Sequence, residues 1–330
     1  MLINKKVLLI MPVFFEYEKD ILLKLKNKGY EVEWIRDRPF DGVFSLFLLR
    51  IFPKMMQLLS SVYFKVNYRS VKYFKYDVIL AINPITLRDK DMRIVISDNI
   101  NAVKILYLWD SINNREHIKK IFPFFNKIFS FDPECSKKYS LTYRPLFFRD
   151  LSKSKSNAQS YDISFIGTMH SDRISVLYKL VTHLPSHVSG YWYIYVRSGL
   201  FLFLNRFFIK DINKLPASYF NTSSLKKSEV SSIVQSSKIV IDIEHPKQSG
   251  LTMRCIEALG ARRKMVTTNS SIKSHDFYDE NNVCIIDRDN PIIPKEFFQS
   301  KYKEIPDDLY YKYSLDGWLD ELLMNCNEKE

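Results

Sequence analysis

The chain has 330 residues, of which 46% are apolar, and this suffices for two domains with separate cores. A formal charge of +12, with 24 Phe and 20 Tyr, favours an anionic partner such as nucleic acid, a membrane surface or a phosphorylated substrate. The four cysteines form no C-x-x-C pair, which argues against a zinc site or a disulfide framework.

The first half of the chain alternates predicted strands and helices. Strand patterns occur at 5–11, 30–34, 76–83, 93–97, 104–109 and 127–132. A helix is expected over 18–28, ended by Gly29. This order is typical of a doubly wound α/β sheet. No G-x-G-x-x-G follows the first strand, so we expect no NAD site there.

Residues 43–66 are strongly apolar, with a narrow polar stripe that includes Arg50, Lys54 and Lys65. Two interpretations stay open for this predicted helix. It packs on the domain core, which we favour, or it rests partly on a lipid surface with its basic side chains at the head groups. The aromatic segment 199–208 is too short to cross a bilayer and suits an interfacial loop or a partner contact.

Two acidic residues of the first half follow predicted strands. Asp110 comes directly after 104–109, at the carboxyl edge where open α/β sheets bind ligands, and Glu16 follows the first strand. The alternative is that these carboxylates have only a structural role, since an Asp before Ser is also a common turn residue or helix cap.

Residues 150–160 lose the apolar periodicity and mark a domain boundary. Beyond them the strand patterns resume, at 161–170, 192–196, 239–243, 265–268 and 282–286. Helices are predicted after Ser171, which is placed to cap one, from 228 to 235, and over 307–323.

The stretch 238–260 combines a buried strand, a polar loop and an amphipathic helix that begins at Leu251. Ser249, Gly250 and Thr252 then lie at a helix N-terminus, which favours an anion such as a phosphate. Arg254 and Glu257 share another face of the helix. They suit a diphosphate and a sugar hydroxyl, or they form an ordinary i,i+3 ion pair.

Two segments carry a family resemblance: 248–254 followed by 257–260, and 162–168. They resemble the donor-binding segments of GT-B glycosyltransferases of bacterial surface-polysaccharide synthesis, which includes lipopolysaccharide, capsule and O-antigen. The resemblance implies an α/β fold of two doubly wound Rossmann-like domains with a C-terminal helix that crosses back to the first. The implied domains are an acceptor-binding domain over 1–155, a donor-binding domain over 156–305 and a crossover helix over 306–330.

By motif position, Glu257 would hold the donor ribose, and the backbone of 249–252 would line the diphosphate. Gly167 would admit the diphosphate from the opposite wall, and His170 would lie beside it. At Ser249 many retaining members carry a Glu, so retaining and inverting chemistry both stay open. The implied donor-binding residues are Gly167, Thr168, Arg173, His245, Lys247, Ser249, Gly250, Leu251, Thr252, Arg254 and Glu257.

For the catalytic base, Asp110 is the first candidate and Glu16 the second. GT-B members generally stabilise the leaving group with basic side chains and helix dipoles, so we expect no metal and no cofactor beyond the nucleotide-sugar co-substrate. Asp287-Arg-Asp289 matches the metal-binding DxD pattern of GT-A enzymes, and we regard it as the weaker interpretation.

The resemblance therefore implies a peripheral membrane transferase that moves a sugar from a nucleotide-sugar to a polysaccharide or lipid-linked saccharide. We expect it in the cytoplasm, because no signal-peptide pattern opens the chain. Association with the anionic inner face of the plasma membrane stays open. The alternative is a non-catalytic membrane-associated assembly protein with the same fold. Nucleic acid is not an expected partner, since no RNP, KH or zinc signature is present.

Overall fold

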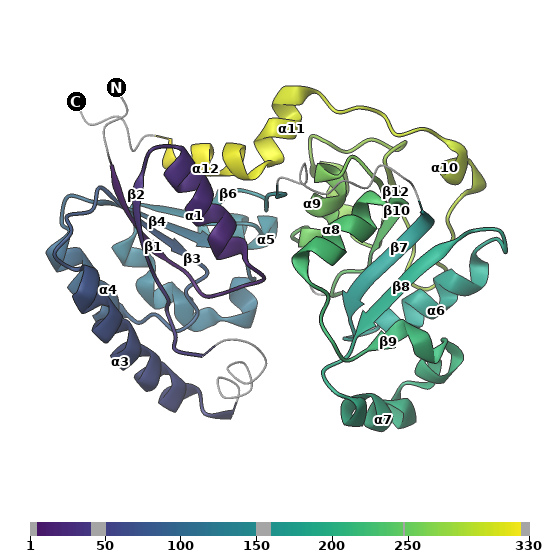
Figure 1. The fold of residues 1–330 in the computed structure, drawn as a ribbon, viewed down its shortest axis with the longest axis horizontal. Coiled ribbons are helices and arrows are strands. Elements are labelled where there is room, and N and C mark those ends of the chain that lie inside the picture. Colours follow the sequence, from purple (N-terminus) through teal and green to yellow (C-terminus); the bar gives the residue numbers. More distant parts are fainter. Residues whose placement is uncertain (1–4, 41–50, 150–159, 247, 325–330) are drawn as a thin grey trace. The chain divides into compact units, whose positions relative to one another are not determined.

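A computed structural model describes residues 5–40, 51–149, 160–246 and 248–324 (Figure 1). The chain divides into two compact units, one formed by 1–145 with 315–330 and the other by 146–314. The divisions thus fall after Pro145 and after Ser314. The sequence prediction placed them after 155, which lies outside the described residues, and after 305.

The first unit is built on a parallel sheet of six strands in the order β2-β1-β3-β4-β5-β6. The order 2-1-3 means that the chain winds outward from β1 in both directions, as a doubly wound sheet does. The strands are β1 (Lys6–Ile10), β2 (Glu31–Ile35), β3 (Val78–Ile82), β4 (Val103–Leu108), β5 (Lys127–Ser130) and β6 (Thr142–Tyr143).

Helices cover both faces of this sheet, so its strands are apolar on both sides. One face packs against α3 (Pro53–Val71) and α4 (Asp89–Asp98), and the opposite face packs against α1 (Tyr17–Asn27) and α12 (Leu315–Leu323). The ring of Trp318 on α12 lies 4.7 Å from that of Tyr107 on β4. Gly29, with a φ of 87°, follows α1 in the left-handed region, as predicted. The remaining elements of this unit are η1 (Ile112–Asn114), η2 (Glu116–Phe124) and α5 (Pro133–Tyr139).

The second unit has a parallel sheet in the order β12-β11-β10-β7-β8-β9. Its strands are β7 (Tyr161–Thr168), β8 (Gly190–Tyr195), β9 (Phe220–Asn221), β10 (Ser237–Asp242), β11 (Lys264–Thr267) and β12 (Val283–Ile285). Its helices are α6 (Arg173–His183), α7 (Gly199–Phe208), η3 (Lys210–Lys214), η4 (Ala217–Tyr219), α8 (Lys227–Gln235), α9 (Met253–Gly260), η5 (Ser270–Ser274), α10 (Lys295–Gln299) and α11 (Asp307–Tyr313). The side chain of Leu177 on α6 joins Ile241 on β10 in one core cluster, whereas α9 contacts β10 and β11 from the other face.

Two predicted elements and one predicted helix cap were wrong. The segment 93–97 is helical within α4, because Met92 and Val95 face the core at helical spacing and tertiary packing overrides the β preference of Ile and Val. The predicted helix over 307–323 is broken at Ser314, and only α12 belongs to the first unit. Asp172, not Ser171, occupies the N-cap position of α6.

The predicted apolar helix over 43–66 corresponds to α3, although 41–50 lie outside the described residues. Phe64 and Tyr68 pack in the core, while Leu58, Val62 and Val66 are about half exposed. The polar stripe is not wholly external, since Ser61 is buried and its hydroxyl contacts the carboxylate of Asp91. The structure thus combines a core-facing side with an exposed apolar side. None of the described helices is long and apolar enough to cross a membrane.

Candidate functional site

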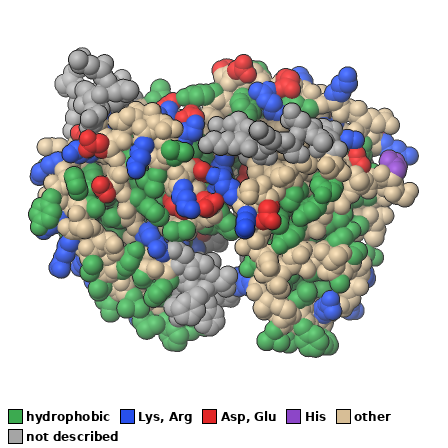
Figure 2. Space-filling model, viewed as in Figure 1, with side chains coloured by type: hydrophobic (Ala, Val, Ile, Leu, Met, Phe, Trp, Pro, Cys, Tyr) green, Lys and Arg blue, Asp and Glu red, His purple; other side chains and the backbone are tan. Residues whose placement is uncertain are grey.

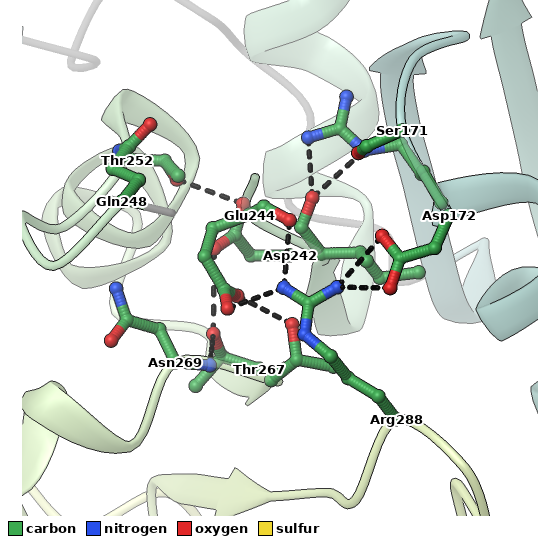
Figure 3. A network of polar contacts seen from close by, with 12 residues as sticks. Ser171, Asp172, Asp242, Glu244, Gln248, Thr252, Thr267, Asn269 and Arg288 are labelled. Atoms are coloured by element: carbon green, nitrogen blue, oxygen red, sulfur yellow. Dashed lines mark hydrogen bonds and ion pairs between the residues drawn. The ribbon is translucent and has the colours of Figure 1, made fainter. Parts of the chain in front are cut away.

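The carboxyl ends of four neighbouring strands meet at one edge of the second sheet. Parallel register places Asp242 beside Thr267, and Thr267 beside Ile285. Polar side chains follow each of these strand ends, from β7, β10, β11 and β12 (Figure 3). Ligands of open α/β sheets bind at such edges. This edge is therefore the candidate site.

Asp242, the last residue of β10, ties the strand to the start of α9. Its buried carboxylate accepts hydrogen bonds from the Thr252 hydroxyl at 2.8 Å, the Cys255 thiol at 3.2 Å and the Thr267 hydroxyl at 3.4 Å. Thr252 is also the N-cap of α9 and accepts from the Cys255 N–H. Burial and the nearby Asp242 raise the pKa of the Cys255 thiol, so this thiol stays protonated and acts as a donor.

Arg288 joins three segments of the site. Its Nη1 donates to the carboxylate of Asp172 at 2.9 and 3.0 Å, and its Nη2 contacts both the carboxylate and, at 2.8 Å, the backbone oxygen of Glu244 (Figure 3). Glu244 is only 5% exposed, and its second carboxylate oxygen accepts from the Thr268 hydroxyl. A buried carboxylate of this kind requires a cation, and Arg288 supplies it.

Sequence reasoning missed this network. Arg288 is the middle residue of the Asp287-Arg-Asp289 pattern that was weighed as a metal motif. The Asp287 carboxylate instead accepts from the backbone N–H groups of Asp289 and Asn290, which makes it a turn residue. Within the described residues, no group of three or more His, Cys, Asp or Glu side chains is placed to share a metal ion. The sequence feature that could have indicated this network is the pair of acidic residues, Asp242 and Glu244, at the end of a predicted strand.

The loop between β10 and α9 is held from one side. The Ser271 hydroxyl donates to the Ser249 carbonyl at 2.6 Å, and the Asn269 amide lies 3.4 Å from the carbonyls of Ser249 and Gly250. In a trans peptide the N–H points opposite to the C=O. The N–H groups of Gly250 and Leu251 therefore point away from η5. The backbones of both residues are buried, whereas Ser249 and Thr252 are partly exposed.

Arg254 and Glu257 lie on the first turn and a half of α9. The Arg254 Nη1 donates to the Glu257 carboxylate at 2.7 Å, and each side chain is 17% exposed. The i,i+3 ion pair weighed in the sequence is thus what the structure contains. Their contacts to a diphosphate and a ribose stay a prediction.

Arg173 and Gly167 have internal roles. The Arg173 guanidinium is buried and donates to the backbone carbonyls of Thr168 and Ile243, which links the ends of β7 and β10. A Cβ on Gly167 would lie 2.7 Å from the Phe165 ring and 3.1 Å from Arg173. Packing inside the unit therefore already requires a glycine there. Thr168 is exposed at the end of β7.

His170 and His245 lie beside each other at this edge, with ring centroids 5.8 Å apart. His170 also shares a hydrogen bond of 2.9 Å with the Ser171 hydroxyl. Burial, followed by the charge of Arg173, lowers the pKa of His170 to about 4. It is therefore neutral near pH 7 and offers a hydrogen bond but no positive charge. The predicted donor residue Lys247 lies outside the described residues.

The two candidate bases are in the first unit. Asp110 follows β4, and its carboxylate accepts from Arg115 Nε at 2.8 Å and from the Ser111 N–H at 3.0 Å. Glu16 has a φ of 63° and is paired with Lys19 at 2.7 Å in an exposed position. Both carboxylates are thus accessible and locally paired. Their catalytic roles remain predictions.

Comparisons with known proteins address the fold. No family model and no curated protein matches this sequence. The N-terminal domain of trehalose-6-phosphate phosphatase from Candida albicans has a TM-score of 0.65 over 98% of this chain and 97% of its own, at 8% identity. HepE from Anabaena in complex with UDP-glucose has a TM-score of 0.53 over 97% of this chain and 93% of its own, at 10% identity.

HepE in complex with UDP and glucose is similar over 98% of this chain and 93% of its own, with a TM-score of 0.51 and 11% identity. These likenesses extend over nearly the whole chain. They agree with the two six-stranded parallel sheets. The predicted GT-B fold is confirmed.

Proposed function

We propose that this protein is a metal-independent glycosyltransferase that moves a sugar from a nucleotide-sugar donor to a polysaccharide or lipid-linked saccharide. The observation that carries the proposal is the start of α9. There the N–H groups of Gly250 and Leu251, which point away from η5, are followed by the Arg254–Glu257 pair at the carboxyl edge of the second sheet. The likeness in fold to a protein crystallised with UDP-glucose supports the same donor class.

The Arg254–Glu257 ion pair suits a nucleoside diphosphate. In the absence of a donor each side chain neutralises the other at 2.7 Å. A bound diphosphate would attract the guanidinium, and the ribose hydroxyls would donate to the released carboxylate. The leaving diphosphate then gains negative charge next to Arg254 and the N-terminus of α9, and both stabilise it. Transfer also needs a base for the acceptor hydroxyl, and Asp110 is our first candidate.

The acceptor side of the proposal rests on charge and apolar surface. A net charge of +12 favours anionic lipids and pyrophosphate-linked acceptors. An exposed apolar face on α3 supports peripheral association with the cytosolic face of a membrane, the location that we propose. That face consists of Met55, Leu58, Leu59, Val62 and Val66.

Calorimetry on the full chain tests the donor site. A thermal-shift screen of UDP-, GDP-, dTDP- and CMP-sugars first selects the nucleotide, because a bound donor stabilises the folded state. Arg254→Ala and Glu257→Ala should then each weaken binding by about tenfold, since each removes a charge-assisted hydrogen bond.

A matched pair of controls lies elsewhere in the same unit. Arg262 and Glu304 also form an ion pair, and Arg262→Ala and Glu304→Ala should bind the donor as the wild type does. Wild-type affinity in both Arg254→Ala and Glu257→Ala would refute the donor site. Tight binding without any transfer or hydrolysis of the sugar would favour the non-catalytic alternative.

A further inference from the structure

Helix α7 (Gly199–Phe208) is anchored on the second unit by one side only. Phe201, Leu202 and Ile209 are partly buried against the core cluster of that unit. The Ser198 hydroxyl caps the helix by accepting from the Phe201 N–H at 3.1 Å. The Asn213 amide donates to the Arg206 carbonyl at 3.2 Å and ties the end of the helix to η3. The helix therefore has a defined outer face.

That outer face is apolar and exposed. Its members fall at i, i+3, i+4, i+7 and i+8, which makes one continuous stripe on a helix. Their exposed fractions run from 49% at Leu204 to 83% at Phe208. The stripe consists of Leu200, Phe203, Leu204, Phe207 and Phe208. Figure 2 shows hydrophobic side chains gathered at the end of the second unit where Figure 1 labels α7.

The charged residues of the segment 197–210, which carries the stripe, are all basic. No Asp or Glu occurs from 197 to 210, and Arg197, Arg206 and Lys210 are exposed. The next residue, Asp211, is held by Lys214 at 2.9 Å, and its hydrogen bond to that lysine lowers its pKa. Phenylalanine and leucine between arginine and lysine are the composition of a helix that lies in a membrane interface.

Other occupants fit this surface less well. A second copy of the chain would bring its own Arg197, Arg206 and Lys210 against these three, since a two-fold interface uses the same patch on both copies. A helix of ten residues is about 15 Å long and falls short of the bilayer core of about 30 Å, so it does not span. An anionic lipid surface can bury the apolar stripe and also bind Arg197, Arg206 and Lys210.

We propose that α7 inserts its Leu and Phe stripe into the head-group region of an anionic bilayer and docks the second unit on it. The arginine and lysine side chains then contact lipid phosphates. This docking site goes beyond the proposed glycosyl transfer and does not depend on it. It adds to the second unit a lipid contact separate from the exposed face of α3.

Flotation of the full chain with vesicles tests the proposal. Binding to phosphatidylcholine vesicles that contain phosphatidylglycerol should fall at least about tenfold in the double variant Phe203→Ser/Phe207→Ser, because two inserted rings are lost. A matched control, Leu23→Ser/Ile100→Ser, removes two exposed apolar side chains from the first unit and should bind as the wild type does. Equal binding by the two double variants would overturn the proposal.

Two further measurements test the role of the basic side chains and the direct contact of α7 with lipid. Arg197→Gln/Arg206→Gln/Lys210→Gln should weaken binding to the anionic vesicles and make it less dependent on salt. Brominated lipids should quench the fluorescence that Phe207→Trp adds to the chain. Absence of that quenching, or sedimentation showing that α7 joins two copies, would overturn the proposal. Donor calorimetry on the Phe203→Ser/Phe207→Ser variant reports separately on the proposed transferase site.

Discussion

The carboxyl edges of the two sheets are built differently. In the second unit, charged and hydroxyl side chains connect neighbouring strands: Asp242 reaches α9 and β11, and Arg288 joins Asp172 to Glu244. In the first unit the acidic residues at this edge mostly bind partners within a few positions along the chain. Asp110 pairs with Arg115, five positions on, and Asp132 caps α5. Asp37, which binds Thr86, instead joins two distant segments.

This difference fits the proposed roles, with the donor bound by the second unit and the acceptor by the first. Buried, cross-linked side chains keep their positions without a ligand, and this suits the binding of a nucleotide of fixed shape. A partly exposed carboxylate with local partners, such as Asp110, can exchange one of them for a substrate hydroxyl. The following predictions test this contrast.

The largest effect is expected at Asp110. If its carboxylate is the base, Asp110→Asn should lower the rate of nucleotide release from the sugar donor that the thermal-shift screen selects by about 10² to 10⁴, the usual contribution of a positioned base. Donor affinity should not change, since the proposed donor site lies in the second unit. Glu16→Gln is the paired variant and should keep most of the activity. A larger loss in Glu16→Gln would move the base to Glu16.

Asp242→Ala should destabilise the second unit by about 3 kcal/mol, because three donors, two of them buried, lose a shared anionic acceptor. Hydrogen exchange of peptides from β10 and α9 measures this opening without assuming that both units unfold together. Asp287→Ala, which removes an exposed turn carboxylate, should change the free energy of this opening by less than about 1 kcal/mol. Unchanged exchange in Asp242→Ala would show that Asp242 does not hold α9.

The smallest effect is a coupling energy. A double-mutant cycle of Arg288→Met and Glu244→Gln should give about 2 kcal/mol, because Glu244 is buried. The corresponding cycle for Arg115 and Asp110 should give less than about 1 kcal/mol, because solvent screens that pair. Equal couplings would remove the contrast between the two edges.

Strand patterns were the most informative part of the sequence. Short apolar runs such as Val78–Ile82 and Ser237–Asp242 are strands because both faces are covered by helices. The segment 93–97 has a similar composition and yet is helical, since only its packing on the sheet distinguishes the two cases. Periodicity over five residues does not separate a buried strand from a buried helix.

Hydrogen-bond partners could not be predicted from the sequence. The role of Arg288 depends on Asp172 and Glu244, which lie 116 and 44 positions away. Arg173 was expected among the donor-binding residues, and in the structure its guanidinium donates to two backbone carbonyls. Two arginines therefore have different roles here because the fold places different hydrogen-bond partners next to them.

The sequence by itself determined the alternating strands and helices, the two-unit α/β architecture and the loop that precedes α9. These follow from local periodicity and turn chemistry, which act over a few residues. Only the tertiary structure decided which charged residues are cross-linked at the strand ends and which apolar side chains of α3 and α7 stay exposed. Those outcomes depend on contacts between segments far apart in the chain, and local sequence patterns do not predict such contacts.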